Sequence, residues 1–463
     1  MPPQNLRPCR VLIAGGGVGG LTLALSLEKH GISYLLLEAY PELAPRRGGG
    51  IAIMPNGARI LDQLGCYDDL RRRAGSVVHR SYLRAPDGTV LATVEDLEKQ
   101  ITESFRHGYP IIWVDRQLLL QTLYDSITVK STLLTNKRIA TVSHLTDGTQ
   151  VTTTDGSVYT GDILIGADGT HSTVRQAIVE RATQLGLGTE YFEEEQIPST
   201  YDCIFGLSPY NSVLVQNPDS EPGSLQFIRG NHYSYVLGTS GPADRTWWFL
   251  MINRGITYYG TENNKTQTYD TAAKETILHA HRDDHLTPKV RLADLLKGPT
   301  ETVYTPLREW VYTKWHLGRL GILGDAAHKM TTTIGQGGNQ AIESAAAMTN
   351  SLAKALSAGA AIKKLSEQEI DTLLEEFQEG RVPRTRMVMA ASRRKQDADA
   401  MEALTSDIPK VFSAIYNTTQ EEELISAGYQ DVDGVSRVGI ISTLTMSHMA
   451  DPEVGIVMWP LQT

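Results

Sequence analysis

The first forty residues alternate between apolar runs and a glycine-rich turn. Residues 9–14 form a short, β-favouring apolar run, which predicts a buried strand. Residues 18–30 then repeat apolar side chains at helical spacing, and residues 33–37 form a second apolar run that ends in Glu38. This order of strand, glycine turn, helix, strand and acid predicts a βαβ unit at the start of the chain.

Three Asp-Gly pairs lie between β-patterned runs, at residues 87–88, 147–148 and 155–156. Asp-Gly is a strong local signal for a β-hairpin turn. The last two pairs predict a small antiparallel meander over about residues 137–159. Residues 162–166, with the sequence D-I-L-I-G, predict another buried strand.

The patterning changes along the rest of the chain. Between about residues 185 and 305, aromatic, β-rich segments alternate with polar loops, which predicts a mostly antiparallel sheet. Residues 338–405 have a helical pattern, with a capping-box signature from Ser366 to Glu369. Pro383 is expected to kink this helix or to begin a new one.

Composition bounds the class of protein. A chain of 463 residues suggests two domains, or one large α/β body with an inserted sheet. With 41% apolar and 21% charged residues, it has the composition of a globular protein. The 43 basic and 53 acidic residues give a net charge of −10, and apart from Arg71 to Arg73 the basic residues are scattered. We therefore expect no nucleic-acid partner.

The cysteines and the two ends of the sequence bear on the cellular compartment of the protein. Cys9, Cys66 and Cys203 are odd in number and far apart, so neither a disulfide framework nor a metal cluster is expected. Residues 1–10 lack the apolar core of a secretory signal. Residues 438–459 contain ionisable side chains and are too polar to span a membrane. These features predict a cytoplasmic protein with no transmembrane segment, and they leave the oligomeric state open.

The turn after the first strand carries the pattern G-x-G-x-x-G through Gly15, Gly17 and Gly20. One glycine permits the turn, one lets the backbone approach a pyrophosphate, and one lets helix and strand pack closely. The phosphates would lie at the positive N-terminus of the helix, and Glu38 is placed to accept hydrogen bonds from a ribose. The pattern predicts dinucleotide binding without separating FAD from NAD.

Two later motifs point to FAD. Asp168 lies in G-A-D-G-T-H-S-T-V-R, and Asp325 lies in G-D-A-A-H, which is followed by G-Q-G-G-N at residues 335–339. A short strand that delivers Asp325, followed by a glycine turn that opens a helix, creates a second helix N-terminus. Such a site can face the ribityl chain and the negative N1–C2=O edge of a reduced flavin.

In this order, the three motifs resemble those of the single-component (group A) FAD-dependent aromatic hydroxylases and epoxidases, over roughly residues 8–400. Residues 51–64 and 115–118 resemble further segments of that family. The chain looks closest to fungal secondary-metabolite enzymes of the paxilline-epoxidase type, which act on prenylated indoles, meroterpenoids or polyenes. One departure is that the family usually has a proline between the histidine and the glycine turn, where this chain has Thr331 to Thr333.

The resemblance implies an α/β fold with a Rossmann-like FAD-binding domain of the glutathione-reductase type. An inserted, mostly antiparallel β-sheet would form the substrate domain, and helices would follow at the C-terminal end. The expected segments are 8–75, 105–184 and 306–360 for the FAD-binding domain, 76–104 and 185–305 for the substrate domain, and 361–463 for the C-terminal helical region.

The resemblance also implies a set of FAD contacts. Glu38 would bind the adenosine ribose, Arg116 the dinucleotide, and Asp325 the pyrophosphate or the ribityl chain. The full set of expected cofactor-binding residues is Gly15, Gly17, Gly20, Glu38, Arg47, Gly50, Ala52, Arg116, Asp168, Asp325, Gly337, Gly338 and Asn339.

The implied activity is that of a flavoprotein monooxygenase, with NADPH or NADH as cosubstrate. NAD(P)H would reduce FAD, and O₂ would add at C4a of the flavin to give a hydroperoxide that oxidises an electron-rich small-molecule substrate. Tyr233 is the preferred candidate for a catalytic or orienting role, although packing is the commoner function of such a tyrosine. The other candidates in the same sheet are Tyr201, Arg229, His232, Tyr235, Trp247 and Trp248.

Several alternatives stay open or are disfavoured. A phenol- or salicylate-type aromatic hydroxylase is the main alternative, and hydroxylation is not separated from epoxidation. A flavin-dependent halogenase would carry a W-x-W-x-I-P segment, which this sequence lacks. An NAD-dependent dehydrogenase would leave the two later motifs unexplained. A binding protein that reuses the FAD fold would lack the turn at Asp325 in this form.

Overall fold

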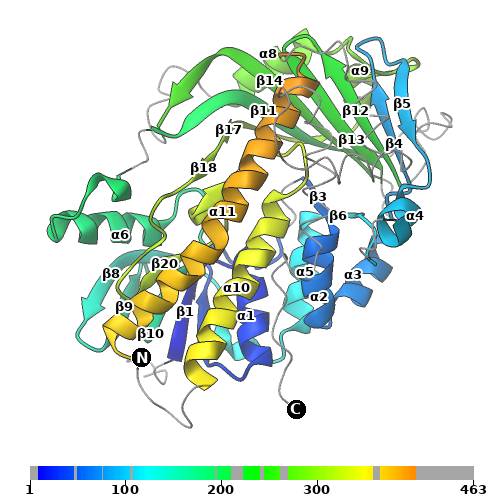
Figure 1. Cartoon of the computed structure of the whole chain (residues 1–463). Coiled ribbons are helices and arrows are strands. Elements are labelled where there is room, and N and C mark those ends of the chain that lie inside the picture. Colours follow the sequence, from blue (N-terminus) through cyan, green and yellow to red (C-terminus); the bar gives the residue numbers. More distant parts are fainter. Residues whose placement is uncertain are drawn as a thin grey trace, which may run out of the picture.

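The computed structural model describes residues 9–45, 49–75, 77–104, 108–192, 196–209, 223–239, 245–260, 269–357 and 365–402. Two large β-sheets organise these residues, one in the lower half of Figure 1 and one in the upper half. Among the described helices, none is both long and apolar enough to cross a membrane.

The lower sheet has eight strands, with a parallel core in the order β20, β10, β1, β2, β7. Val11, Leu12 and Ile13 in β1 are fully buried, because helices and neighbouring strands cover both faces of a parallel strand. Its strands are β1 (Cys9–Ala14), β2 (Tyr34–Leu37), β7 (Leu133–Leu134), β8 (Ile139–Leu145), β9 (Gly148–Thr153), β10 (Val158–Gly166), β19 (His316–Leu317) and β20 (Leu320–Ile322).

The predicted meander is confirmed, with one difference. Strands β8, β9 and β10 pair antiparallel through turns at the two Asp-Gly pairs. However, residues 158–166 form one continuous strand, not the end of the meander and a separate buried strand. The first half of β10 pairs with β9, and its second half pairs in parallel with β1, so the strand joins the meander to the parallel core.

The helices pack around this sheet, with α1 against both α5 and α10, and α6 along β8, β10 and β20. The described helices are α1 (Val18–Lys29), α2 (Pro55–Gln63), α3 (Tyr67–Ala74), α4 (Leu97–Lys99), α5 (Arg116–Ser126), α6 (Thr173–Gln184), α8 (Thr271–Ala280), α9 (Leu292–Leu295), α10 (Gly337–Ser357) and α11 (Glu367–Asp399).

The upper sheet has seven strands in the order β17, β11, β14, β13, β12, β4, β5. Every neighbouring pair is antiparallel except β12 and β4, which run parallel. A mostly antiparallel second sheet was predicted from the patterning, and it is confirmed. Its strands are β4 (Arg80–Arg84), β5 (Val90–Val94), β11 (Pro198–Pro209), β12 (Ser224–Gly230), β13 (Tyr233–Thr239), β14 (Arg245–Tyr259) and β17 (Glu301–Arg308).

Successive side chains of the upper sheet point to opposite faces. The inner face, which carries Cys203, Trp247 and Phe249, packs against the small antiparallel pair β3 (Gly50–Ile53) and β6 (Ile112–Asp115). The outer face carries Tyr235 and Trp248, which pack with residues of α8 and α9. Two further short pairs are β15 (His285–Thr287) with β16 (Val290–Arg291), and β18 (Trp310–Val311) with β21 (His328–Lys329).

Helix α11 connects the two halves of the molecule. It has 33 residues and begins with the predicted capping box between Ser366 and Glu369. At about 1.5 Å per residue it is roughly 50 Å long, and Figure 1 shows it running from the lower sheet to the upper one. It does not end at Pro383, so a new helix does not start there. Leu374 packs in the core of the lower sheet, and Ala400, just past the helix end, packs against the inner face of the upper sheet.

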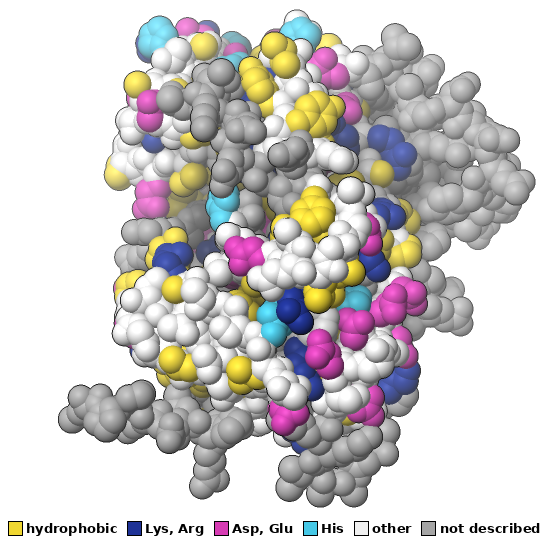
Figure 2. Space-filling view, turned by 90° about the vertical axis from the view of Figure 1, so that its left-hand side faces the viewer, with side chains coloured by type: hydrophobic (Ala, Val, Ile, Leu, Met, Phe, Trp, Pro, Cys, Tyr) yellow, Lys and Arg dark blue, Asp and Glu magenta, His cyan; other side chains and the backbone are white. Residues whose placement is uncertain are grey.

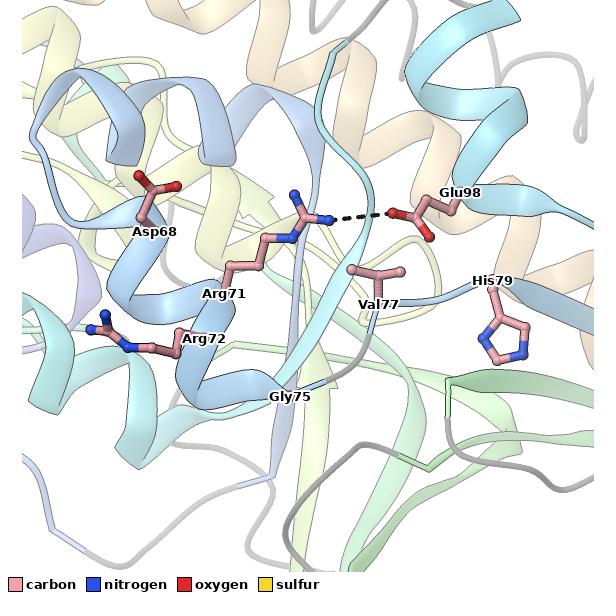
Figure 3. A pocket seen from close by; sticks show the side chains of 7 residues that line it. All are labelled: Asp68, Arg71, Arg72, Gly75, Val77, His79 and Glu98. Carbon is pink, nitrogen blue, oxygen red and sulfur yellow. Dashed lines mark hydrogen bonds and ion pairs between the residues drawn. The ribbon is translucent and has the colours of Figure 1, made fainter.

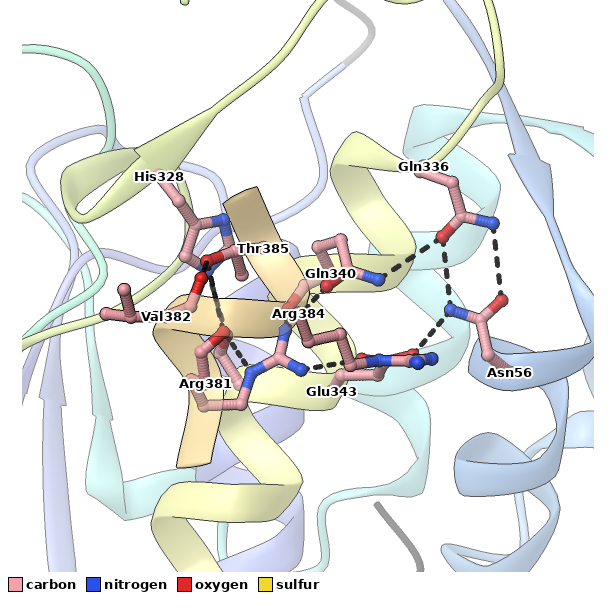
Figure 4. Close-up of polar contacts among 10 residues, drawn as sticks. Asn56, His328, Gln336, Gln340, Glu343, Arg381, Val382, Arg384 and Thr385 are labelled. Atoms are coloured by element: carbon pink, nitrogen blue, oxygen red, sulfur yellow. Dashed lines mark hydrogen bonds and ion pairs between the residues drawn. The ribbon is translucent and has the colours of Figure 1, made fainter. Parts of the chain in front are cut away.

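A buried carboxylate joins α11 to α10 (Figure 4). Glu343 of α10 accepts hydrogen bonds from Arg381 at 2.7 Å and from Arg384 at 2.6 and 2.7 Å. Asn56 of α2 donates to the same carboxylate at 2.7 Å. Burial opposes the charge of Glu343, but the two guanidiniums outweigh it and lower its pKa to about 2.

Removal of this carboxylate should destabilise the protein strongly. We expect Glu343→Gln to lower the free energy of unfolding by about 3–5 kcal/mol, because two buried arginines lose their counter-charge. Urea denaturation measures the change. The matched control is Glu376→Gln, which breaks an exposed pair between the same two helices, with Lys354 at 3.1 Å. It should change stability by less than about 1 kcal/mol, and equal effects of the two substitutions would contradict the prediction.

The same carboxylate should make stability depend on acid pH. Its folded pKa of about 2 lies below the ordinary value of 4.5. Its contribution is therefore complete above pH 4.5 and is lost as the pH falls towards 2. Over that window the unfolding free energy of the wild type should fall more steeply than that of Glu343→Gln. Parallel pH profiles of urea midpoints would show that Glu343 is not the group responsible.

Candidate functional site

The glycine turn between β1 and α1 is closed tightly against the end of β10. Gly15 has φ +96°, which favours glycine, and its N–H donates to the Leu37 carbonyl at 2.8 Å. A Cβ on Gly15 would lie 2.7 Å from the Ala167 carbonyl oxygen, and a Cβ on Gly20 would lie 1.9 Å from the Gly15 carbonyl oxygen. Both glycines are therefore required by the backbone packing of the turn itself.

Gly17 differs, because the space beside it is open. It directly precedes α1 with an extended backbone (φ −74°, ψ −171°). A Cβ there would have only the Arg116 Nη2 within 4 Å, at 3.9 Å. The N-terminus of α1 thus presents its N–H groups to a space that a guanidinium also borders, which is suited to an anion.

Arg116 is the first residue of α5 and is half buried. Burial lowers the pKa of its guanidinium, while the carboxylates of Asp325 and Glu38 oppose that shift. Among the residues that the structure describes, its guanidinium has no hydrogen-bond partner. Nearby carboxylates thus favour the charge of Arg116, while its N–H groups stay able to donate to a ligand.

Glu38 stands at the end of β2, next to the same turn. Its Oε2 accepts the Gly16 N–H at 2.6 Å and its Oε1 accepts the Tyr40 N–H at 2.8 Å. These bonds hold the carboxylate in one orientation. Each oxygen keeps a further lone pair, so the group can also accept from hydroxyls such as those of a ribose.

The hydrogen bonds of Asp168 run to the start of α6. Its Oδ1 accepts from the Ser172 hydroxyl at 2.5 Å, and its Oδ2 accepts the N–H groups of Thr173 and Val174 at 2.7 and 3.3 Å. The carboxylate therefore binds the N-terminus of α6, and burial raises its pKa despite these bonds. The expected contact of Asp168 with FAD stays a prediction, beside this observed role at the start of α6.

Asp325 lies in a single turn of 3-10 helix, Gly324–Ala326, at the carboxyl end of β20. Its side chain is 43% exposed, and Lys329 is 3.8 Å away. His328, three residues on, is fully buried, with its Nε2 2.9 Å from the Ser344 hydroxyl. Burial lowers the pKa of His328 to about 3, so the ring is neutral and structural. Asp325 is the open carboxylate of this motif.

We call residues 335–339 the flavin-side turn, because the sequence motif predicts that the flavin binds beside these residues. Asn339 is fully buried, and its amide ties the turn to β3. Its Nδ2 donates to the carbonyls of Ala52 and Gly335, both at 2.8 Å, and its Oδ1 accepts the Met54 N–H at 3.0 Å. The Asn339 side chain therefore positions the backbone around the site.

The turn opens directly into α10. A Cβ on Gly337 would have no heavy atom within 4 Å, whereas one on Gly338 would lie 2.5 Å from Ile51 Cδ1. The first N–H groups of α10 have no partner within the helix, because the N-terminal turn of any helix lacks them. This second helix N-terminus faces open space at Gly337.

An aromatic wall lies beside β3, on the inner face of the upper sheet and on β6. A Cβ on Gly50 would be 2.3 Å from Trp113 Nε1 and 2.8 Å from Trp247 Cγ. Trp113 is 6.0 Å from Phe249 and 6.2 Å from Trp247, and Phe249 is 5.2 Å from Phe205, between ring centroids. Trp113, Trp247 and Phe249 are buried, so the wall is part of an apolar cluster between β3 and the upper sheet.

The sequence-predicted pocket residues divide between the two faces. Tyr201, Arg229 and Trp247 belong to the inner face, but Tyr201 donates to Asp397 at 2.9 Å and Arg229 to the Ala398 carbonyl at 2.9 Å. His232 lies in the turn between β12 and β13, 2.8 Å from Glu402.

Tyr233 is not brought to the site. Its ring packs against Tyr235 at 5.7 Å and against His281 at 4.9 Å, on the outer face of the sheet. Trp248 lies on that same face. The choice of Tyr233 for a catalytic role is therefore corrected. The sequence alone did not show which face carries Tyr233, because every second side chain of β13 points away from the FAD-binding half.

Three wall residues were missed from the sequence: Trp113, Phe205 and Phe249. The period of two along β14 could have grouped Trp247 with Phe249 and separated both from Trp248. Arg47, expected to contact FAD, lies outside the described residues.

A surface hollow of about 680 Å³ lies apart from this site, by α3 and α4 (Figure 3). Arg71 and Glu98, which line it, pair with each other at 3.4 Å. None of the expected FAD residues lines the hollow. On the face shown in Figure 2, acidic and basic side chains are interspersed over the described surface.

Comparison with known proteins assigns the chain to a family. A family model described as "FAD binding domain" matches residues 8–390, so the chain belongs to this family of flavoproteins. Within it, the chain is an FAD-dependent monooxygenase. It is 36% identical to the FAD-dependent monooxygenase spyC of Aspergillus fumigatus over 390 residues, which cover 83% of this chain and 78% of spyC. It is 37% identical to prhF of Penicillium brasilianum, also a FAD-dependent monooxygenase, with the same coverage.

Solved structures share the fold. The structure of Klebsiella pneumoniae HpxO with FAD and uric acid has a TM-score of 0.64 at 20% identity, covering 96% of this chain and 98% of HpxO. CtdE in complex with FAD and a substrate has a TM-score of 0.66 at 17% identity, covering 90% of this chain and 100% of CtdE. The predicted fold class, the resemblance to group A monooxygenases and FAD as cofactor are thus confirmed.

The open space at Gly17 gives a direct test of where FAD binds. We expect Gly17→Ala to leave the stability of the FAD-free protein nearly unchanged, since the new methyl group meets no protein atom closer than 3.9 Å. FAD affinity should fall by about tenfold or more, equal to at least about 1.4 kcal/mol, because the methyl group would block a pyrophosphate. Flavin-fluorescence titration measures the affinity and thermal unfolding measures the stability.

Gly20→Ala serves as the contrasting variant. Its Cβ would lie 1.9 Å from a backbone oxygen, so the FAD-free protein itself should be destabilised. If Gly17→Ala bound FAD as tightly as the wild type, the pyrophosphate would not lie at the N-terminus of α1.

Proposed function

We propose that the chain is an NAD(P)H- and O₂-dependent monooxygenase that hydroxylates or epoxidises an electron-rich aromatic, indole or prenylated substrate in fungal secondary metabolism. The observation that carries the substrate class is the aromatic wall of Trp113, Trp247, Phe249 and Phe205 beside β3 and the flavin-side turn. Such a wall favours a large apolar substrate, whose burial gains about 25 cal/mol per Å².

The described residues fit FAD at three places. The α1 N-terminus at Gly17, with the unpartnered Arg116, suits the pyrophosphate, and Glu38 suits the adenosine ribose. The open carboxylate of Asp325 suits the ribityl hydroxyls. Within this proposal, Gly50, Ala52, Gly337 and Gly338 supply backbone beside the flavin ring.

Bound FAD would supply the redox chemistry, accepting two electrons from NAD(P)H and activating O₂. The chain supplies position and environment. The N-terminus of α10 would favour negative charge on a flavin bound beside it. The aromatic wall keeps water away from the substrate side, which limits the loss of activated oxygen as H₂O₂.

The charges near the wall bear on the main alternative, a salicylate-type hydroxylase. A carboxylate or phenolate substrate needs a cation or strong donors in a buried site. On the described inner face, Arg229 donates through Nη2 to the Ala398 carbonyl, but its buried Nε has no hydrogen-bond partner among the described residues. Burial lowers the pKa of Arg229, and the nearby Asp399 carboxylate opposes that shift. The proposed preference for an apolar substrate therefore rests on the aromatic wall and not on the charges of this face.

The experiment compares substrate classes on the purified, FAD-loaded protein. The probes are a prenylated indole, a prenylated phenol and salicylate, each with NADPH or NADH. We expect the apolar prenylated probes to stimulate O₂ uptake and to give a product heavier by one oxygen atom, while salicylate does neither. Mass spectrometry after mild acid hydrolysis separates an epoxide, which opens to a diol, from a hydroxylated product.

A control without substrate measures the background oxidation of NAD(P)H to H₂O₂. Stimulation by salicylate with one-oxygen insertion, and none by the prenylated probes, would overturn the proposed substrate class in favour of the alternative. The ratio of rates with NADPH and NADH assigns the electron donor.

A further inference from the structure

We propose that Ser392 of α11 is a positioning residue for the flavin-side turn, acting through the hydroxyls of Thr331 and Thr333. This inference rests on the proposed placement of FAD against that turn. The three threonines at 331–333 lead into the flavin-side turn, and hydrogen bonds to Ser392 hold this segment against α11.

Ser392 makes three contacts with the segment. Its Oγ donates to the Thr331 carbonyl at 2.7 Å and lies 2.5 Å from the Thr331 hydroxyl. Its own carbonyl accepts from the Thr333 hydroxyl at 3.0 Å. The two threonine hydroxyls are 3.3 Å apart, which closes the group. All three side chains are buried, so water cannot replace these bonds when one is lost.

The segment leads directly into the flavin-side turn. The Gly335 N–H donates to the Thr332 carbonyl at 3.0 Å, so a shift of the threonines would move the glycine that starts the turn. A proline would restrict this backbone through its ring, which locks φ. Threonine leaves φ free, and the hydrogen bonds to α11 restrict the backbone instead.

The same part of α11 is fixed to the substrate half. Gln396 donates to Ser234 of β13 at 3.2 Å, and Asp397 accepts from Tyr201 of β11 at 2.9 Å. The Thr332 hydroxyl, between the two threonines held by Ser392, lies 3.6 Å from Met251 Sδ on the inner face. Ser392 therefore fixes the position of the flavin-side turn relative to the aromatic wall. This position in turn sets the distance between the flavin and the substrate.

The test removes the hydroxyl and measures FAD binding. We expect Ser392→Ala to weaken FAD binding by about tenfold, the effect of losing one or two buried hydrogen bonds. Flavin fluorescence of the bound cofactor should rise, because the ring is held less firmly. The control is Thr385→Val, which removes another buried hydroxyl of α11, one bonded only to the Arg381 and Val382 carbonyls of the same helix.

Thermal unfolding of the FAD-free proteins separates positioning from simple stability. Both substitutions should lower the melting temperature, but only Ser392→Ala should change FAD affinity and flavin fluorescence. Thr331→Val tests the contact from the other side and serves if Ser392→Ala does not fold. In the double variant the losses of FAD affinity should be less than additive, because both substitutions remove one shared interaction.

The outcomes distinguish this inference from the function on which it rests. If the wild type binds FAD and loses affinity on Gly17→Ala, while Ser392→Ala and Thr331→Val both bind FAD as Thr385→Val does, only the positioning role is overturned. If affinity is unchanged in Gly17→Ala as well, the proposed placement of FAD fails, and the positioning role fails with it.

Discussion

The arrangement of the whole molecule depends on a carboxylate that two arginines share in its interior. Glu343 pays a large desolvation cost, and it stays ionised only because Arg381 and Arg384 both face it. Since the glutamate belongs to α10 and the arginines to α11, the charge requirement fixes one helix against the other. Apolar packing alone would allow the two helices to slide, whereas a fork of guanidinium donors accepts a single geometry.

That constraint reaches the site along two routes. Helix α10 begins at the flavin-side turn, so its axis sets where the helix N-terminus points. Helix α11 continues past the ion pair to Ser392 and to the inner face of the upper sheet. Helix α11 thus contacts both the cofactor half and the substrate half and fixes their relative position. The residues around the site come from strands that are far apart in the sequence.

The cofactor side of the site could be predicted from sequence because its determinants are local. Gly15 to Gly20 and Glu38 lie within one βαβ unit, and the need for Gly20 follows from a backbone contact inside that unit, although Gly15 also meets Ala167 just after β10. Asp168 matched a motif, but its carboxylate serves the helix that begins five residues later. A motif identifies a residue that the fold needs and does not say whether a ligand touches it.

The substrate side could not be predicted in the same way. Tyr233 and Trp247 both lie in aromatic, β-rich segments, and their faces depend on register within the sheet, which pairing between distant strands decides. The contacts of α11 with both halves could not be predicted either. Its capping box and helical period could be recognised in the sequence, but its partners are scattered over the chain: Glu343, Thr331 and Ser234.

The lone parallel pair of the upper sheet, β4 with β12, has a consequence for how the chain folds. Arg80 in β4 pairs with Ser224 in β12, so one edge of the β4–β5 hairpin stays open until a strand that follows β10 in the chain has paired with it. An open edge of this kind invites pairing with other chains until it is covered. Because so many contacts are non-local, folding should be slow. The two sheets are separate layers of the architecture, and the chain passes from one to the other several times.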